Sequence, residues 1–248
     1  MRLKNKVAVV TGAAQGFGHA IALSFAREGA KLVLADTKAE KVKEVKSEVV
    51  SIGTDALALE ADVSDERSIL KLRDETLEKY NRVDILVNNA GIYPHSLTLE
   101  MAEEEWDQVL DTNLGGNFIC SRAFVPQMRS LKGGRIICIA SDIAYRGANG
   151  GSHYAASKAG IVGFVKALAR ELAEDGITVN SICPGIADTA LPRSHRSEED
   201  LYARAKQIPL GRIAQIDDIA RVATFLATSA ASYITGQALL VDGGSLMV

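Results

Sequence analysis

The sequence predicts an α/β fold with a doubly wound, mostly parallel sheet of seven strands and helices on both faces. Three observations lead to this prediction. Short apolar runs typical of buried strands alternate with longer amphipathic runs typical of helices along all 248 residues. A glycine-rich turn lies between the first strand and the first helix, and an acidic residue ends the second strand. No linker or repeat divides the chain, so we expect residues 1–248 to form one domain.

The expected strands lie near residues 6–11, 31–36, 55–60, 83–88, 134–140, 177–182 and 237–241. The expected helices lie near residues 17–29, 38–52, 65–80, 103–130, 153–174 and 216–228. Residues 186–209 form the least regular segment, and a segment of this length after a strand often covers a site. Its charged run at residues 197–200 can cap a short helix.

Composition fits an enzyme that stays in the cytoplasm. With 47% hydrophobic residues the chain can bury a large core, and a net charge of -3 gives no reason to expect nucleic acid. No apolar run is long enough to cross a membrane, and residues 1–5 lead into a strand without the core of a signal peptide. Cys120, Cys138 and Cys183 are odd in number and lie in apolar surroundings, so we expect buried thiols rather than disulfides or metal ligands.

The turn after the first strand has the spacing of a phosphate-binding site, Thr-Gly-x-x-x-Gly-x-Gly over residues 11–18. Gly12 permits the tight turn, Gly16 lets the backbone approach a pyrophosphate, and Gly18 allows close packing of the helix. The helix that follows offers free N–H groups to the anion. We therefore expect a dinucleotide here.

Asp36 ends the second strand, where a carboxylate can accept hydrogen bonds from both ribose hydroxyls of an adenosine. The same charge repels a phosphate ester at the 2′ position, so the sequence favours NAD over NADP. The turn carries Ala14 and Gln15 rather than a basic residue, although Lys38 lies two positions after Asp36 and weakens this preference.

Tyr154 and Lys158 are four residues apart in a predicted helix and therefore share a helix face. A lysine held beside a tyrosine favours the phenolate, which brings proton exchange closer to neutral pH. Such a tyrosine can act as a general acid and base.

With these features the whole chain resembles the short-chain dehydrogenase/reductase family. Further motifs follow in that family's order: Asp62-Val63, the Asn-Asn-Ala-Gly run at 88–91, Asn113, Ser141, Tyr154 with Lys158, Pro184-Gly185 and the Asp-Gly-Gly run at 242–244. The resemblance implies a single-domain Rossmann fold and a catalytic set of Asn113, Ser141, Tyr154 and Lys158, with no metal. It also implies that NAD contacts Gly12, Gln15, Gly16, Phe17, Gly18, Asp36, Asp62, Val63, Asn89, Ala90, Gly91, Tyr154, Lys158, Pro184, Gly185, Ile186 and Thr189.

In the implied reaction, hydride passes reversibly between C4 of the nicotinamide and a carbinol or carbonyl carbon. Tyr154 exchanges a proton with the substrate oxygen and Ser141 holds that oxygen. Lys158 binds the nicotinamide ribose and lowers the pKa of the tyrosine, while Asn113 holds a water that links the lysine to solvent. A serine hydrolase is excluded for two reasons. His153 and Tyr154 are neighbouring helix positions, which point in different directions, and the nucleophile-elbow pattern is missing.

The substrate pocket is expected to include Tyr93, Ile143, Tyr145 and His153. These side chains are largely apolar or aromatic, and the sequence shows no cationic cluster for a carboxylate or phosphate. We therefore expect a neutral secondary alcohol or ketone as the substrate.

Two other functions stay open. A 3-oxoacyl-carrier-protein reductase has the same length and C-terminal pattern, but it generally uses NADPH and needs basic residues toward its acidic carrier. Asp36 opposes NADPH, and the acidic pair at 174–175 lies where a docking cation would be expected. The second alternative is a catalytically silent NAD-binding scaffold, which the intact set of four residues argues against.

The helices at 103–130 and 153–174 carry more apolar residues than one sheet face needs. In the family that the chain resembles, such helices imply a homotetramer.

Overall fold

The computed structural model describes residues 1–189 and 197–248, apart from the side chain of Tyr202. Its strands are β1 (Val7–Thr11), β2 (Lys31–Asp36), β3 (Ala56–Glu60), β4 (Ile85–Asn88), β5 (Gly134–Ile139), β6 (Ile177–Pro184) and β7 (Ala238–Val241). They form one sheet in the order β3-β2-β1-β4-β5-β6-β7, and every pair of neighbours is parallel. The predicted fold class and all seven predicted strands are confirmed.

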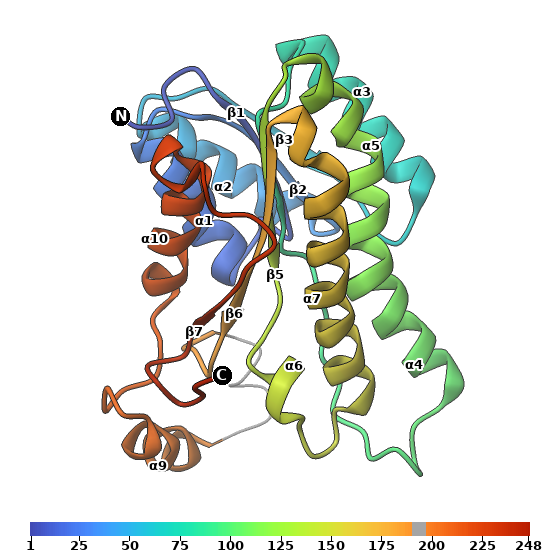
Figure 1. The fold of residues 1–248 in the computed structure, drawn as a ribbon, viewed down its shortest axis with the longest axis vertical. Helices are drawn as coiled ribbons and strands as arrows, with labels where there is room; N and C mark the ends of the chain where they lie inside the picture. Colours follow the sequence, from blue (N-terminus) through green and yellow to red (C-terminus); the bar gives the residue numbers. More distant parts are fainter. Residues whose placement is uncertain (190–196) are drawn as a thin grey trace.

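Helices cover both faces of this sheet (Figure 1). On one face lie α1 (Gly16–Arg27), α2 (Ala39–Ser51) and α10 (Ile216–Ala227). On the other lie α3 (Glu66–Tyr80), α5 (Gly116–Ser130) and α7 (Ser152–Leu172), with α4 (Glu103–Leu110) beside α7. Two apolar cores result, one on each face, because the buried parallel strands expose apolar side chains in both directions.

Four shorter elements also belong to the described chain. They are α6 (Ile143–Arg146), α9 (Glu198–Gln207) and the 3₁₀ turns Ala173–Asp175 and Ser229–Ala231. Helix α9 begins after Ser197, whose side chain accepts a hydrogen bond from the Asp200 N–H at 3.2 Å, as the charged run predicted. Residues 190–196 of the segment expected to cover the site lie outside the described residues.

The predicted helix at 103–130 is wrong in one respect, because it is not continuous. A π-helical turn, Asp111–Gly115, separates α4 from α5. The Asn113 side chain exchanges two hydrogen bonds with the backbone of Ile92, which pulls this turn away from regular α-helical pairing. Such π-helical insertions are frequent at functional sites.

The carboxyl ends of the strands meet at one end of the sheet, the end at which α6 and α9 lie in Figure 1. Strands β1 and β4 are neighbours there although β1 is followed in sequence by β2. Ligands of doubly wound sheets bind outside such a reversal of strand order.

Candidate active site

A cavity of about 730 Å³ opens beyond the carboxyl ends of the strands. It brings together residues from the glycine turn, from the ends of β2 to β6, and from α6, α7 and α9. Of the residues expected at the site, those that line it are Gly12, Gln15, Gly16, Phe17, Asp36, Asp62, Val63, Asn89, Ala90, Gly91, Tyr93, Ser141, Ile143, Tyr154, Lys158, Pro184, Gly185, Ile186 and Thr189. Gly18, Asn113, Tyr145 and His153 are not among the lining residues.

The glycine turn leaves space that side chains would fill. Gly12 has φ +63°, and a Cβ there would lie 2.8 Å from Asn89 Nδ2. A Cβ on Gly18 would overlap the carbonyl oxygen of Gly12 and come within 2.6 Å of Asn89 Nδ2. Gly18 therefore packs directly against the turn and does not line the cavity. Gly16 has φ +58°, and among the described residues the nearest atom to a Cβ added there would be Thr189 Cγ2, at 4.0 Å. The described residues therefore leave open the place where a pyrophosphate would meet the start of α1.

Asn89 fixes the turn from the neighbouring strand. Its Nδ2 donates to the carbonyl oxygens of Thr11 (2.9 Å) and Gly12 (3.0 Å). The Thr11 hydroxyl accepts from the N–H groups of Asn89 (3.0 Å) and Ala90 (3.2 Å). These bonds join residues that are 77 to 79 positions apart and hold the ends of β1 and β4 in fixed register.

Asp36 lies at the rim of the cavity with both carboxylate oxygens already engaged by backbone. Oδ2 accepts from the Ala14 N–H and Oδ1 from the Lys38 N–H, each at 3.0 Å. The Lys38 ammonium turns toward Gln15 Oε1, 3.1 Å away. The carboxylate is therefore oriented by its own turn, while the lysine is held beside it.

Tyr154 and Lys158 lie on one face of α7 and both are buried. Lys158 Nζ donates to the Ile139 carbonyl at 2.7 Å and lies 5.4 Å from the centre of the Tyr154 ring. Burial raises the pKa of Tyr154, an effect that the nearby Ser141 hydroxyl only partly offsets. The role of Lys158 in lowering this pKa stays a prediction, because burial dominates both groups in the protein alone and lowers the pKa of Lys158 itself, to about 8.

Asn113 is fully buried in the π-helical turn and reaches the site indirectly. Its Oδ1 accepts from the Ile92 N–H at 2.8 Å, and its Nδ2 donates to the Ile92 carbonyl and to Ser157 Oγ. A Cβ on Gly91 would lie 3.0 Å from Asn113 Oδ1 and 3.6 Å from Lys158 Nζ. The asparagine oxygen and the lysine nitrogen thus both lie close to Gly91.

The substrate end of the cavity is partly aromatic, as expected, but two of the expected residues lie elsewhere. The Tyr93 ring stacks on the Tyr154 ring with centroids 4.2 Å apart. His153 is fully buried behind them, with Nε2 3.3 Å from Glu105 Oε1 on α4 and Nδ1 accepting from the Tyr154 N–H. Tyr145 lies on α6 with 39% of its surface exposed, outside the cavity.

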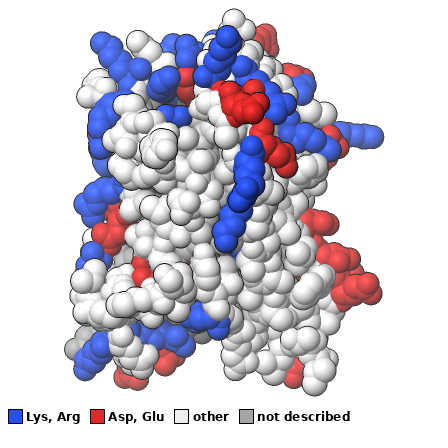
Figure 2. All heavy atoms as spheres, in the orientation of Figure 1, with Lys and Arg blue, Asp and Glu red and all other residues white. Residues whose placement is uncertain are grey.

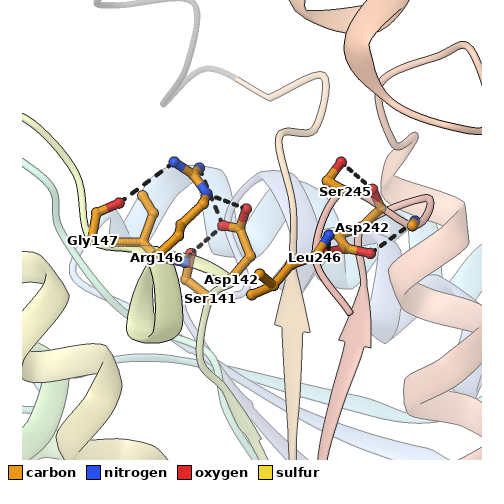
Figure 3. Close-up of polar contacts among 9 residues, drawn as sticks. Ser141, Asp142, Arg146, Gly147, Asp242, Ser245 and Leu246 are labelled. Atoms are coloured by element: carbon orange, nitrogen blue, oxygen red, sulfur yellow. Dashed lines mark hydrogen bonds and ion pairs between the residues drawn. The ribbon is translucent and has the colours of Figure 1, made fainter. Parts of the chain in front are cut away.

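Sequence reasoning missed the charged residues of the cavity wall. Asp142 and Arg146 line it and form an ion pair, with Arg146 Nε 2.7 Å from Asp142 Oδ2 (Figure 3). Arg204 lines it from α9. The sequence showed no cationic cluster for a carboxylate or phosphate, and these two arginines of the cavity wall were not considered. The signal of Arg146 was weak because α6 is a four-residue turn, too short to produce a periodic pattern.

A comparison with models of known protein families shows the family to which this chain belongs. A family model described as "Enoyl-(Acyl carrier protein) reductase" matches residues 12–245, which is nearly the whole chain. The chain belongs to the short-chain dehydrogenase/reductase family. It is accordingly an oxidoreductase of this family, and the resemblance stated from the sequence is confirmed.

Several proteins of the short-chain dehydrogenase/reductase family resemble this chain over its full length. The 3-oxoacyl-[acyl-carrier-protein] reductase FabG of Staphylococcus aureus is 42% identical over 246 residues, covering 98% of both chains. FabG of Escherichia coli is 39% identical over 248 residues, covering 100% of both. Among solved structures, levodione reductase superposes with a TM-score of 0.94 at 32% identity, covering 98% of both chains.

Burial of the charge on Lys158 opposes folding, as it does for any buried lysine. We therefore expect the free energy of unfolding of this member of the short-chain dehydrogenase/reductase family to depend on that charge. The folded pKa is about 8 against the ordinary 10.5. Between these values the unfolded chain binds more protons, so stability rises with pH there, and the cost of burial is fully present below about pH 8. Lys158→Met is therefore expected to raise the free energy of unfolding near pH 7 by on the order of 2 to 3 kcal/mol. Urea denaturation measures this, and the gain should shrink toward pH 10; an equal gain at both pH values would contradict the assignment.

Proposed function

We propose that this protein catalyses reversible hydride transfer between a nicotinamide cofactor and a carbonyl or secondary alcohol carbon. The observation that carries the proposal is that Ser141, Tyr154 and Lys158 line the same cavity as the glycine turn. The turn fits a dinucleotide, because its Gly12 and Gly16 have left-handed φ and leave the phosphate position free of side chains. The cofactor would supply the hydride chemistry when bound, and the chain would supply orientation and proton transfer.

Each of the four residues has a proposed role at a stated atom. The Tyr154 hydroxyl gives a proton to the substrate oxygen in reduction and removes it in oxidation. Ser141 Oγ holds the same oxygen, and Lys158 Nζ binds the cofactor ribose. Asn113 anchors the proton path behind Lys158. Burial raises the pKa of Tyr154, so in the protein alone the hydroxyl is protonated near neutral pH, which is the form that gives the proton in reduction.

For the cofactor we propose NAD(H), with Gly12 to Gly18 at the pyrophosphate, Asp36 at the adenosine ribose and Asp62-Val63 at the adenine. The support is the oriented carboxylate of Asp36, which a 2′-phosphate would meet as a like charge. Ile186 and Thr189 are proposed to hold the nicotinamide end.

Replacing Asp36 with alanine tests this preference. The variant loses the repulsion of a 2′-phosphate while Lys38 stays nearby, so the ratio of kcat/KM with NADH to that with NADPH is expected to fall by about tenfold or more, the effect of roughly 1.4 kcal/mol or more of like-charge repulsion. Steady-state rates with both cofactors measure it. Asp62→Ala is the matched control, because it removes a cavity carboxylate that is not assigned to the ribose. A preference for NADPH in the wild-type protein would overturn the proposal for NAD(H).

A 3-oxoacyl thioester is the first substrate class to test. The relatives named 3-oxoacyl-[acyl-carrier-protein] reductases match the full length of the chain at 39% to 42% identity. The charged wall of Arg146 and Arg204 gives a polar entrance to the cavity, which suits the polar arm of an acyl thioester better than an apolar pocket would.

A neutral secondary alcohol oxidised with NAD is the second candidate, and two observations favour it. The Tyr93 ring covers the face of Tyr154, which suits a flat or cyclic substrate. Arg129 Nε lies 2.7 Å from Asp175 Oδ2, so this exposed arginine beside the acidic pair at 174–175 offers less net positive charge to an acidic carrier. A catalytically silent scaffold remains a third possibility, which turnover of any substrate would eliminate.

The deciding experiment measures initial rates in both directions. Acetoacetyl thioesters with NADH and NADPH form one arm, and cyclic and aryl secondary alcohols with NAD and NADP form the other. Thioester reduction at least tenfold more efficient than alcohol oxidation supports the first class, and the reverse ratio supports the second. NAD binding without turnover in either arm would support the silent scaffold.

The homotetramer stays a prediction. Figure 2 shows a broad area with few charges over α7, and exposed apolar side chains at Leu99, Trp106 and Phe118 lie on or beside α4 and α5. Burial of this area between copies would explain its composition. Sedimentation velocity is expected to give four times the monomer mass, and a sharp boundary at monomer mass would refute the homotetramer.

Among the described helices none is both long and apolar enough to cross a membrane.

A further inference from the structure

The Ser141 hydroxyl has a competitor for its proton. Ser141 Oγ accepts from the Ile143 N–H at 3.2 Å and donates to Asp142 Oδ1 at 3.2 Å. A serine hydroxyl has one proton, so it cannot donate to Asp142 and fully to a substrate oxygen at the same time. A charged acceptor such as Asp142 is stronger than a neutral carbonyl oxygen.

Asp142 is a buried carboxylate, and Arg146 is the cation that compensates it. The Asp142 side chain is 5% exposed, whereas that of Arg146 is 41% exposed. Arg146 Nε donates to Oδ2 at 2.7 Å, and Nη2 reaches Oδ1, the atom that Ser141 also uses, at 3.4 Å (Figure 3). The arginine therefore shares the very oxygen that competes for the serine proton.

Among the described residues, Tyr154 on α7 and Cys183 on β6 are ionisable groups that feel the charge of Asp142. Burial holds the thiol and the phenol neutral, since it raises the pKa of Cys183 to about 11 and that of Tyr154 as well. Lys158 Nζ donates to the Ile139 carbonyl. Within the described part of the chain, the guanidinium of Arg146 is the cation that contacts this carboxylate.

We propose that Asp142 and Arg146 form a positioning pair that sets how readily Ser141 donates its hydrogen bond to the substrate oxygen. The inference rests on the proposed role of Ser141 in hydride transfer. Asp142 orients the free hydroxyl, and Arg146 draws charge from the carboxylate so that the proton can move to the substrate when it arrives. Neither residue touches the reacting atoms in this assignment.

Arg146→Gln tests the pair, because it leaves the buried carboxylate without its cation. Asp142 then holds the serine proton more strongly, and kcat/KM at pH 8 is expected to fall about tenfold, less than the roughly 10²- to 10³-fold that loss of an oxyanion donor costs.

The double variant Asp142→Asn/Arg146→Gln provides the rescue. It removes both charges and keeps similar shapes, so kcat/KM is expected to return to within about threefold of wild type, the scatter usual for removal of a compensated pair. The KM of Arg146→Gln should change little, since the deficit lies in transition-state stabilisation and therefore in kcat.

Arg82→Gln is the matched control. Arg82 pairs with the buried Asp84 just before β4, at the far end of the sheet, and the exposures of this pair, 40% and 8%, resemble those of Arg146 and Asp142. Lys6 Nζ, 3.0 Å from Asp84 Oδ1, still compensates this carboxylate, so loss of Arg82 is expected to lower stability less than loss of Arg146 does and to leave kcat unaltered. Thermal unfolding of all variants separates folding defects from catalytic ones.

Three outcomes overturn the inference: a kcat of Arg146→Gln equal to that of wild type, a double variant as impaired as the single one, or the same fall in kcat in Arg82→Gln. The proposed function fails separately, if Ser141→Ala retains full activity. Loss of activity in Ser141→Ala with a normal kcat in Arg146→Gln would leave the proposed function intact and reject only the positioning pair.

Discussion

Tyr154→Phe is expected to lower kcat by about 10² to 10⁴-fold, the usual contribution of a positioned general acid or base. The phenol lies in the cavity with Ser141 and Lys158, and a phenylalanine ring cannot exchange the proton. The ring stack on Tyr93 and the buried position of the side chain are kept, so stability should change little. Rates under saturating substrate and cofactor measure the loss, and fluorescence titration with NADH should show binding within a few-fold of wild type.

Tyr80→Phe is the matched control, since Tyr80 ends α3 and lies outside the cavity. Its kcat is expected to equal that of the wild-type protein. If Tyr154→Phe retained more than a tenth of the wild-type rate, another group would have to transfer the proton, and the assignment of Tyr154 would be rejected.

Gly18→Ala is expected to be the most damaging single methyl that can be added to this chain at the cofactor end. The new Cβ would overlap the Gly12 carbonyl oxygen, a backbone atom that Asn89 also holds, so the turn cannot move aside easily. Overpacking of this kind costs about 1 to 3 kcal/mol of stability. Displacement of the turn should also weaken NADH binding by more than about tenfold, because each 1.4 kcal/mol is a factor of ten.

Gly115→Ala serves as its control. Gly115 also has helical backbone, but a Cβ there would lie 3.7 Å from the nearest atom, an ordinary contact. Denaturation midpoints and NADH titrations of both variants measure the contrast. A Gly18→Ala protein as stable as Gly115→Ala, with unchanged NADH affinity, would show that the turn adapts and that the close packing is not required.

The sequence was sufficient for the sheet because its strands are buried on both faces. Apolar runs such as 31–36 differ sharply from the amphipathic helices between them, and the predicted strands agree with the structure to within about two residues. The glycine turn was equally predictable from the sequence. Gly12 and Gly16 have left-handed φ, which favours glycine over other residues, so the turn leaves a pattern in the sequence itself.

The wall of the substrate end was less predictable for a physical reason. His153 and Tyr145 were expected in the pocket because they lie near Tyr154 in sequence, yet α7 turns His153 toward Glu105 and α6 turns Tyr145 outward. Arg204 reaches the cavity from a helix 46 to 50 positions beyond Tyr154 and Lys158. Contacts between distant segments depend on packing, which local patterns do not encode.

The bonds of Asn89 also make the nucleotide site dependent on the order of assembly. Until Asn89 docks, the carbonyl oxygens of Thr11 and Gly12 lack their side-chain partner and the turn is not held in shape. A nascent chain that has completed β1, β2 and β3 therefore possesses every glycine of the turn without a rigid anion cradle. If the turn binds a dinucleotide as proposed, we expect its affinity to arise only after β4 has paired with β1, so that ligand binding depends on this long-range contact as well as on the glycine motif.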